Sequence, residues 1–127
     1  MELVRLYQSY SEINRTYMTF IEETVNADFK SQEKEVILQT LVKAKEELEE
    51  LMAASNEINP GEEDEVNFKD LKYLLVDTLF LAIDLLDFYK AGEEGRFKMR
   101  VLNHLNKKRR AEMFGENNQM GCRVNPM

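Results

Sequence analysis

The sequence predicts an all-α protein, with an antiparallel four-helix bundle as the first choice and a helical dimer that shares one core as the alternative. Three observations carry this prediction. The 127 residues include only two Pro and five Gly, which favours long helices over a turn-rich β fold. Apolar residues recur at helical spacing in four segments. The connections between these segments are short, long and short, as expected for antiparallel neighbours.

The most apolar segment, residues 71–89, is expected to form the central helix. It reads LKYLLVDTLFLAIDLLDFY, and its three aspartates fall within one sector of a helix that turns about 100° per residue. This places Leu79 in the core and Asp84 at the periphery. Asn67 is the expected N-cap, and Gly92 can end the helix in the left-handed conformation. Three aspartates near the centre of a bilayer would be costly, so we interpret the segment as a core helix and not a membrane span.

Two further helices are expected before it. The first runs from Glu2 to about Val25, where apolar residues alternate in steps of three and four. Ser31 is the expected N-cap of the second, which continues to about Ser55 through the strongly helical KAKEELEELMAA. Residues 56–66 combine Pro-Gly with four consecutive acids, so we expect a solvated loop.

The fourth helix is expected from Glu93 to about Phe114, folded back on the central helix after a short turn. From Gly115 onward the sequence has no apolar period, which predicts a loose tail. We therefore expect one bundle domain over residues 1–114 and a flexible tail over residues 115–127.

The net charge of −7 is unevenly distributed along the chain. Residues 1–95 hold 9 Lys/Arg and 22 Asp/Glu, a net charge of −13, whereas residues 96–127 hold 8 Lys/Arg and 2 Asp/Glu, a net charge of +6. This asymmetry is the clearest compositional signal. The amino end, MELVRLYQSY, lacks the basic, apolar and small-residue segments of a secretory signal, so we expect a cytoplasmic protein.

Motifs that carry common enzyme chemistry are missing from the sequence. It has no Gly-rich phosphate loop, no Cys/His cluster and no nucleophile elbow. The single histidine, His104, shares a helix side with Phe97 and Val101, which favours a place at the edge of the core over a role as ligand or base. We therefore assign no catalytic or cofactor-binding residue and expect no cofactor.

One acidic cluster offers a different interpretation. Glu46-Glu47-Leu48-Glu49-Glu50 places carboxylates at i and i+3, which can share a divalent cation when a facing helix adds more acids. With VILQTLVKAKEELEELMAA, LLVDTLFLAIDLLDF and the basic NHLNKKRR, it resembles the all-α nucleoside triphosphate pyrophosphohydrolases of the MazG and dimeric dUTPase type. The resemblance implies a Mg²⁺ site at Glu47, Glu50 and Asp77. Leu74 stands where that family has a further glutamate, so one metal carboxylate is missing.

The basic run at the end of the fourth helix has three candidate uses. Lys107, Lys108, Arg109 and Arg110 can pair with acids of their own bundle, bind an acidic protein partner, or contact nucleic acid. A body of charge −13 would repel a polyanion, which disfavours nucleic acid. We interpret the chain as a small helical protein that acts by protein–protein binding, in a regulatory or adaptor role without catalysis, and that does not engage membranes. The alternative is a Mg²⁺-dependent pyrophosphohydrolase, active or degenerate.

Overall fold

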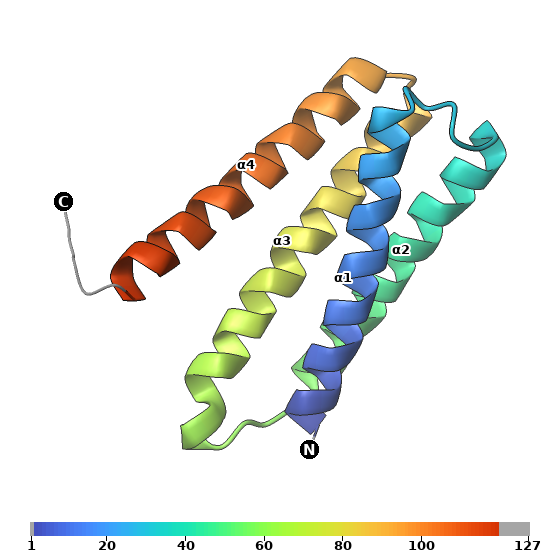
Figure 1. The fold of residues 1–127 in the computed structure, drawn as a ribbon. Helices are drawn as coiled ribbons and strands as arrows, with labels where there is room; N and C mark the ends of the chain where they lie inside the picture. Colours follow the sequence, from blue (N-terminus) through green and yellow to red (C-terminus); the bar gives the residue numbers. More distant parts are fainter. Residues whose placement is uncertain (1, 120–127) are drawn as a thin grey trace.

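The computed structural model describes the backbone of residues 2–119 and the side chains of residues 3–107. Within this part the chain forms four α-helices, each antiparallel to the next, and no strand (Figure 1). The elements are α1 (Glu2–Asn26), α2 (Lys34–Asn56), the 3₁₀ turn η1 (Glu62–Asp64), α3 (Glu65–Lys90) and α4 (Glu94–Gln119). The prediction of an all-α four-helix bundle is confirmed.

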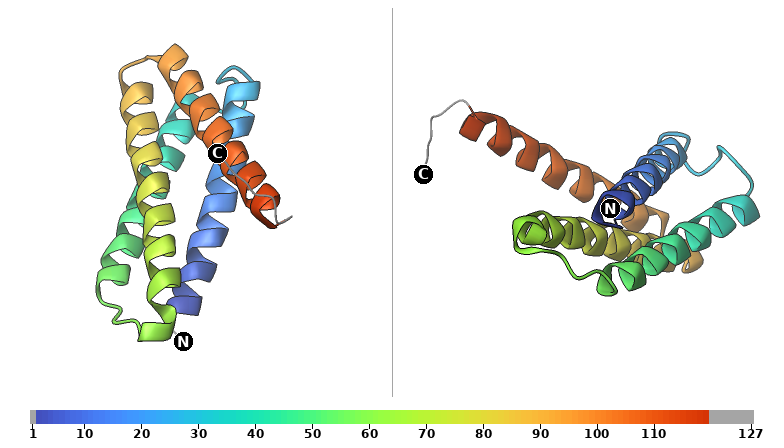
Figure 2. Two further views of the ribbon diagram at one scale, coloured as in Figure 1. Left: turned by 90° about the vertical axis from the view of Figure 1, so that its left-hand side faces the viewer. Right: turned by 90° about the horizontal axis from the view of Figure 1, so that it is seen from below.

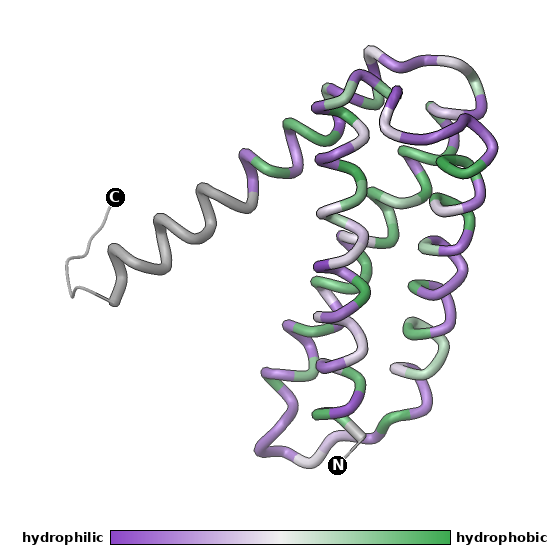
Figure 3. The backbone as a smooth tube through the Cα atoms, turned by 45° about the vertical axis from the view of Figure 1, so that its right-hand side comes forward, coloured by the Kyte–Doolittle hydropathy of each residue, from purple (hydrophilic) through white to green (hydrophobic). Residues whose placement is uncertain are grey.

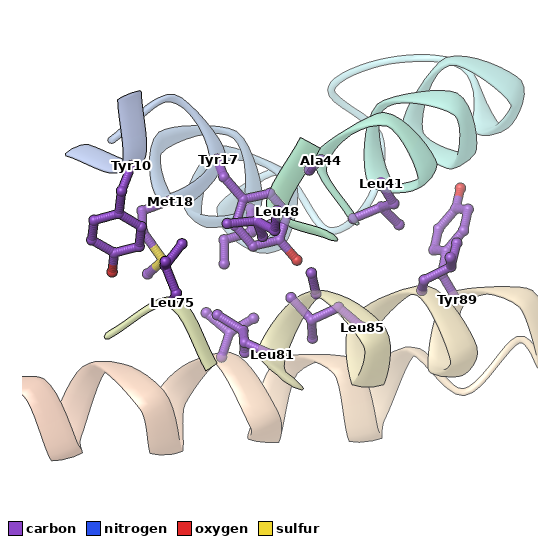
Figure 4. Packing of buried hydrophobic residues seen from close by; sticks show 14 of the residues in the cluster. Tyr10, Tyr17, Met18, Leu41, Ala44, Leu48, Leu75, Leu81, Leu85 and Tyr89 are labelled. Atoms are coloured by element: carbon purple, nitrogen blue, oxygen red, sulfur yellow. The ribbon is translucent and has the colours of Figure 1, made fainter. Parts of the chain in front are cut away.

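The core lies mainly between α1, α2 and α3. Apolar and polar residues alternate along these helices (Figure 3), and the buried side chains are mostly the apolar ones. Figure 4 shows Tyr17 and Met18 of α1 and Leu48 of α2 on the side of the core that faces Leu75, Leu81 and Leu85 of α3, and all six belong to one buried cluster. The fully buried side chains of this core include Ile21, Ile37, Leu41, Leu48, Leu75, Leu81 and Leu85. Burying each such side chain contributes roughly 1.5–3 kcal/mol before conformational entropy is subtracted.

Helix α4 covers only part of the bundle. It packs on α3 and touches α1, but within the described residues it has no contact with α2. Phe97 and Val101 are its buried anchors. Towards its carboxyl end α4 diverges from α3, so its later turns stand away from the other three helices (Figures 1 and 2). One side of α1 and α3 is therefore left uncovered.

An aromatic cluster joins the α1–α2 corner to the α3–α4 corner. The ring centroid of Phe29, in the α1–α2 turn, lies 5.0 Å from that of Phe97 on α4 and 6.1 Å from that of Tyr89 on α3. Asp28 and Phe29 adopt positive φ angles of 53° and 63°, which are unfavourable for residues with side chains. The ring contacts help to offset this strain. The corner thus fixes the position from which α4 diverges.

Two helix starts differ from the predictions. Helix α2 begins at Lys34, after an extended Glu33 that makes no side-chain cap, so Ser31 is not its N-cap. Helix α3 begins at Glu65, and Asn67 lies inside it. The acidic run at residues 62–65 winds into η1 and the first turn of α3, where negative charge suits the helix dipole. The predicted end of α3 is confirmed, because Gly92 has a φ of 73°.

The orientation of α3 also differs from the prediction. Leu79 is only partly buried, whereas Leu81 and Leu85 are fully buried. Asp84 lies at the edge of the α3–α4 interface, where its half-exposed side chain pairs with Arg100. Helix α4 continues past the predicted end at Phe114 to Gln119, and the part of the predicted tail from residue 120 onward lies outside the described residues. No helix in the described part of the chain is long and apolar enough to span a bilayer.

Candidate protein-binding surface

The uncovered side of α1 and α3 forms a groove that α4 borders on its far side. This central groove has a volume of about 470 Å³. Its lining comes from all three helices and includes Tyr10, Asn14, Tyr73, Asp77, Thr78, Phe80, His104 and Lys107. Two residues selected from the sequence, Asp77 and Lys107, therefore lie in one groove.

The polar floor of the groove links α1 to α3. The hydroxyl groups of Tyr10 and Thr78 share a hydrogen bond of 2.9 Å, and the Thr78 hydroxyl lies 3.5 Å from the amide oxygen of Asn14, which can accept from it. Burial raises the pKa of Tyr10, while its hydrogen bond to Thr78 acts in the opposite direction. These groups satisfy one another, so the floor contributes mainly to holding α1 against α3.

Asp77 lies beside two residues of α4. Its carboxylate lies 3.0 Å from the ammonium nitrogen of Lys107 and 3.9 Å from Nδ1 of His104. His104 is only 8% exposed, which agrees with the expected place at the edge of the core. A metal ion at Asp77 would have to displace the Lys107 ammonium group. The geometry is that of a structural ion pair between α3 and α4.

The three carboxylates expected to share Mg²⁺ are not brought together as a ligand set. Glu47 lines a different groove of about 440 Å³ between α1 and α2, and Glu50 is exposed on α2. Asp77 faces α4. Among the side chains that the structure describes, no group of three or more His, Cys, Asp or Glu residues is placed to hold a metal ion. The metal arrangement implied by the resemblance is therefore not formed within one chain.

The basic residues of α4 pair extensively with acids of the same chain. Arg100 Nε lies 2.9 Å from a carboxylate oxygen of Asp84, and Lys98 Nζ lies 2.6 Å from one of Asp28. The Lys98 ammonium group beside Asp28 lowers the pKa of that carboxyl. Lys107 joins this pattern through Asp77. The side chains of Lys108, Arg109 and Arg110 lie outside the described residues.

Exposed apolar side chains gather on the uncovered side, and we call these five residues the open face. Their exposed fractions are Val4 49%, Tyr7 54%, Tyr73 79%, Leu74 44% and Phe80 57%. Tyr73, Leu74 and Phe80 line the central groove. Val4, Tyr7 and Leu74 line an adjacent hollow of about 390 Å³. Leu74 borders both depressions, so the two adjoin each other.

The open face was not predicted from the sequence. The segment 71–89 predicts a central helix, but an apolar run cannot by itself show which of its positions a neighbouring helix leaves uncovered. Tyr73 and Phe80 are seven residues apart with Asp77 between them, so all three fall on one side of the helix. This spacing could have indicated a mixed polar and aromatic surface on α3.

Comparison with known proteins does not identify the chain. No family model, curated protein or solved structure matches it significantly.

Proposed function

We propose that this protein acts by binding another protein, in a regulatory or adaptor role, through the open face and the basic end of α4. The observation that carries the proposal is that five exposed apolar residues line two adjoining depressions along α1 and α3. Single exposed apolar residues are ordinary on a protein surface, but a contiguous patch beside polar residues is typical of an interaction site. Aromatic residues such as Tyr73 and Phe80 are also enriched at such interfaces.

The partner surface that suits this chemistry is an acidic amphipathic helix. Its apolar side chains would lie on the open face, in the manner of a helix bound in a groove. Its acidic side chains would meet the basic end of α4, residues 107–110, which belongs to the part of the chain with a net charge of +6. Such charge complementarity speeds association and selects the partner.

A direct test uses a fluorescent synthetic helix as the probe. The first peptide carries leucines at i, i+3, i+4 and i+7 with flanking glutamates, and the second replaces each glutamate with lysine. Anisotropy titrations with the full chain should give tighter binding of the acidic peptide, with an affinity that falls as salt rises. Equal affinity for both peptides would contradict the proposed chemistry.

Matched variants locate the binding surface. Phe80→Glu and Tyr73→Glu each place a charge on the open face and should weaken acidic-peptide binding by roughly tenfold or more, the effect expected for losing an aromatic interface residue. Val36→Glu is the control, because Val36 is 41% exposed on α2 and lines neither the central groove nor the adjacent hollow. Unchanged binding in both open-face variants would remove this surface from the proposal.

Nucleic acid is the competing partner class, and the same titration format tests it. A labelled oligonucleotide should not bind at about 0.15 M salt, where screening leaves only close contacts. Replacing Lys107, Lys108, Arg109 and Arg110 with Gln should weaken binding of the acidic peptide. A micromolar, salt-dependent oligonucleotide complex that this four-Gln variant abolishes would overturn the proposal.

A further inference from the structure

Acidic and basic residues pair across α3 and α4 at a regular interval. Asp84 meets Arg100 and Asp77 meets Lys107. The two aspartates are seven residues apart on α3, and the two basic residues are seven apart on the antiparallel α4. Residues seven apart share one side of a helix, so these pairs form a seam between the two helices.

The row of aspartates on α3 continues past the last turn of α4 that packs on α3. Asp70 lies a further seven residues towards the start of α3 and lines the hollow that also includes Val4, Tyr7 and Leu74. The matching position on α4 is residue 114, a phenylalanine, and α4 has diverged from α3 before this point (Figures 1 and 2). Asp70 forms no ion pair with any residue whose side chain the structure describes.

The chain carries the basic residues that this acidic end lacks. Lys108, Arg109 and Arg110 follow Lys107 in the sequence of α4, on the turns that leave α3. On the turns just before them, Arg100 and Lys107 already pair with aspartates of α3 in the same chain. Acids at residues 62–65 add negative charge next to the start of α3.

We infer that the acidic partner surface is a second copy of this chain. The basic end of α4 from one copy lies against the hollow around Asp70 in the other, and the same contact is repeated in the opposite direction. This inference rests on the proposed function, since it names the partner of the same surface. A two-fold arrangement makes each contact twice, so weak individual ion pairs add up. Burial of Val4, Tyr7 and Leu74 supplies the apolar contribution.

The test is sedimentation velocity of the full chain over a range of micromolar concentrations, at about 0.15 M salt, where close ion pairs still contribute. The parent should form a reversible dimer. Asp70→Lys should raise the dimer dissociation constant by about tenfold or more. In both symmetric contacts the new lysine would face the basic end of α4 from the other copy, and like charges repel. Asp87→Lys is the matched control, since Asp87 is an exposed acid on the same helix, outside the hollow, and should leave dimerisation unchanged.

A mixing experiment separates a lost contact from damage to the fold. The second variant replaces Lys108, Arg109 and Arg110 together with Glu. Each variant alone should be monomeric, because its own contacts are repulsive. An equimolar mixture should dimerise, because both contacts then join opposite charges. The lysine at position 70 of the first variant meets the three new glutamates of the second. Asp70 of the second variant meets the unchanged basic end of the first. Circular dichroism checks that both variants are helical.

The outcomes distinguish this inference from the proposed function. A parent that stays monomeric at every concentration but still binds the acidic peptide overturns the second-copy inference and leaves the proposed function standing. A dimer whose affinity is the same in Asp70→Lys, or a mixture that fails to dimerise, also overturns the inference. Peptide titrations are run below the dimer dissociation constant, so that self-association does not compete.

Discussion

The hydroxyl groups of Tyr10 and Thr78, 68 positions apart in the sequence, share a hydrogen bond of 2.9 Å between α1 and α3. Both side chains are buried. Tyr10→Phe keeps the ring but leaves the Thr78 hydroxyl with only a long contact to Asn14. We expect this variant to lose about 1 kcal/mol of unfolding free energy, a typical value for one hydrogen bond. Urea unfolding measures the change, and an unaltered midpoint would contradict the structural role of this bond.

Tyr17 offers the opposite case on the same helix. Its hydroxyl is buried and has no hydrogen-bond partner in the described part of the chain. Burying an unpaired hydroxyl costs free energy, so Tyr17→Phe should leave stability unchanged or raise it by about 1 kcal/mol. A clear loss of stability in Tyr17→Phe, measured by the same urea unfolding, would show that this hydroxyl does make a favourable contact.

The two tyrosines also predict how stability depends on alkaline pH. Burial raises the pKa of both phenols above the usual value of about 10. The folded protein therefore keeps phenolic protons that the unfolded chain releases. Their contribution is fully present below about pH 10 and is lost as pH rises through the folded-state pKa values. Urea midpoints at about pH 8 and about pH 11 should show this loss, and Tyr17→Phe should reduce it. Equal losses in the parent and in Tyr17→Phe would exclude Tyr17 as a source.

The burial pattern of α3 predicts which leucine matters most for stability. Leu81 is fully buried, whereas Leu79 is only partly buried. Leu81→Ala should cost about 2–5 kcal/mol through lost burial and the cavity left behind. Leu79→Ala should cost clearly less, because its site is partly open to solvent. Thermal melts of the two variants compare these costs directly. A larger loss of stability in Leu79→Ala would contradict this orientation of α3.

The same pair shows how far the sequence determines the fold. Apolar periodicity and Gly92 were sufficient to predict four helices and the α3–α4 turn. They did not predict the rotation of α3, because that helix is apolar on more than one side. Asp77 and Asp84 in fact face basic residues of α4.

The candidate site was harder to predict for a related reason. Asp77 and Lys107 were each selected from the sequence, but for two different sites, and their pairing depends on the register between α3 and α4. The open face depends on where α4 diverges. Neither property follows from the periodicity of a single helix.

The resemblance to nucleoside triphosphate pyrophosphohydrolases leads to a separate prediction. A functional Mg²⁺ site binds only the native state and stabilises it by mass action, by about 2.7 kcal/mol when the ion is at about a hundred times its dissociation constant. In this chain Lys107 pairs with Asp77, and Glu47 faces the α1–α2 groove. We therefore expect millimolar Mg²⁺ or Mn²⁺ to leave the melting temperature unchanged, and no release of pyrophosphate from a panel of nucleoside triphosphates. A rise in melting temperature that Glu50→Gln abolishes, together with pyrophosphate release, would favour the enzyme over the binding protein.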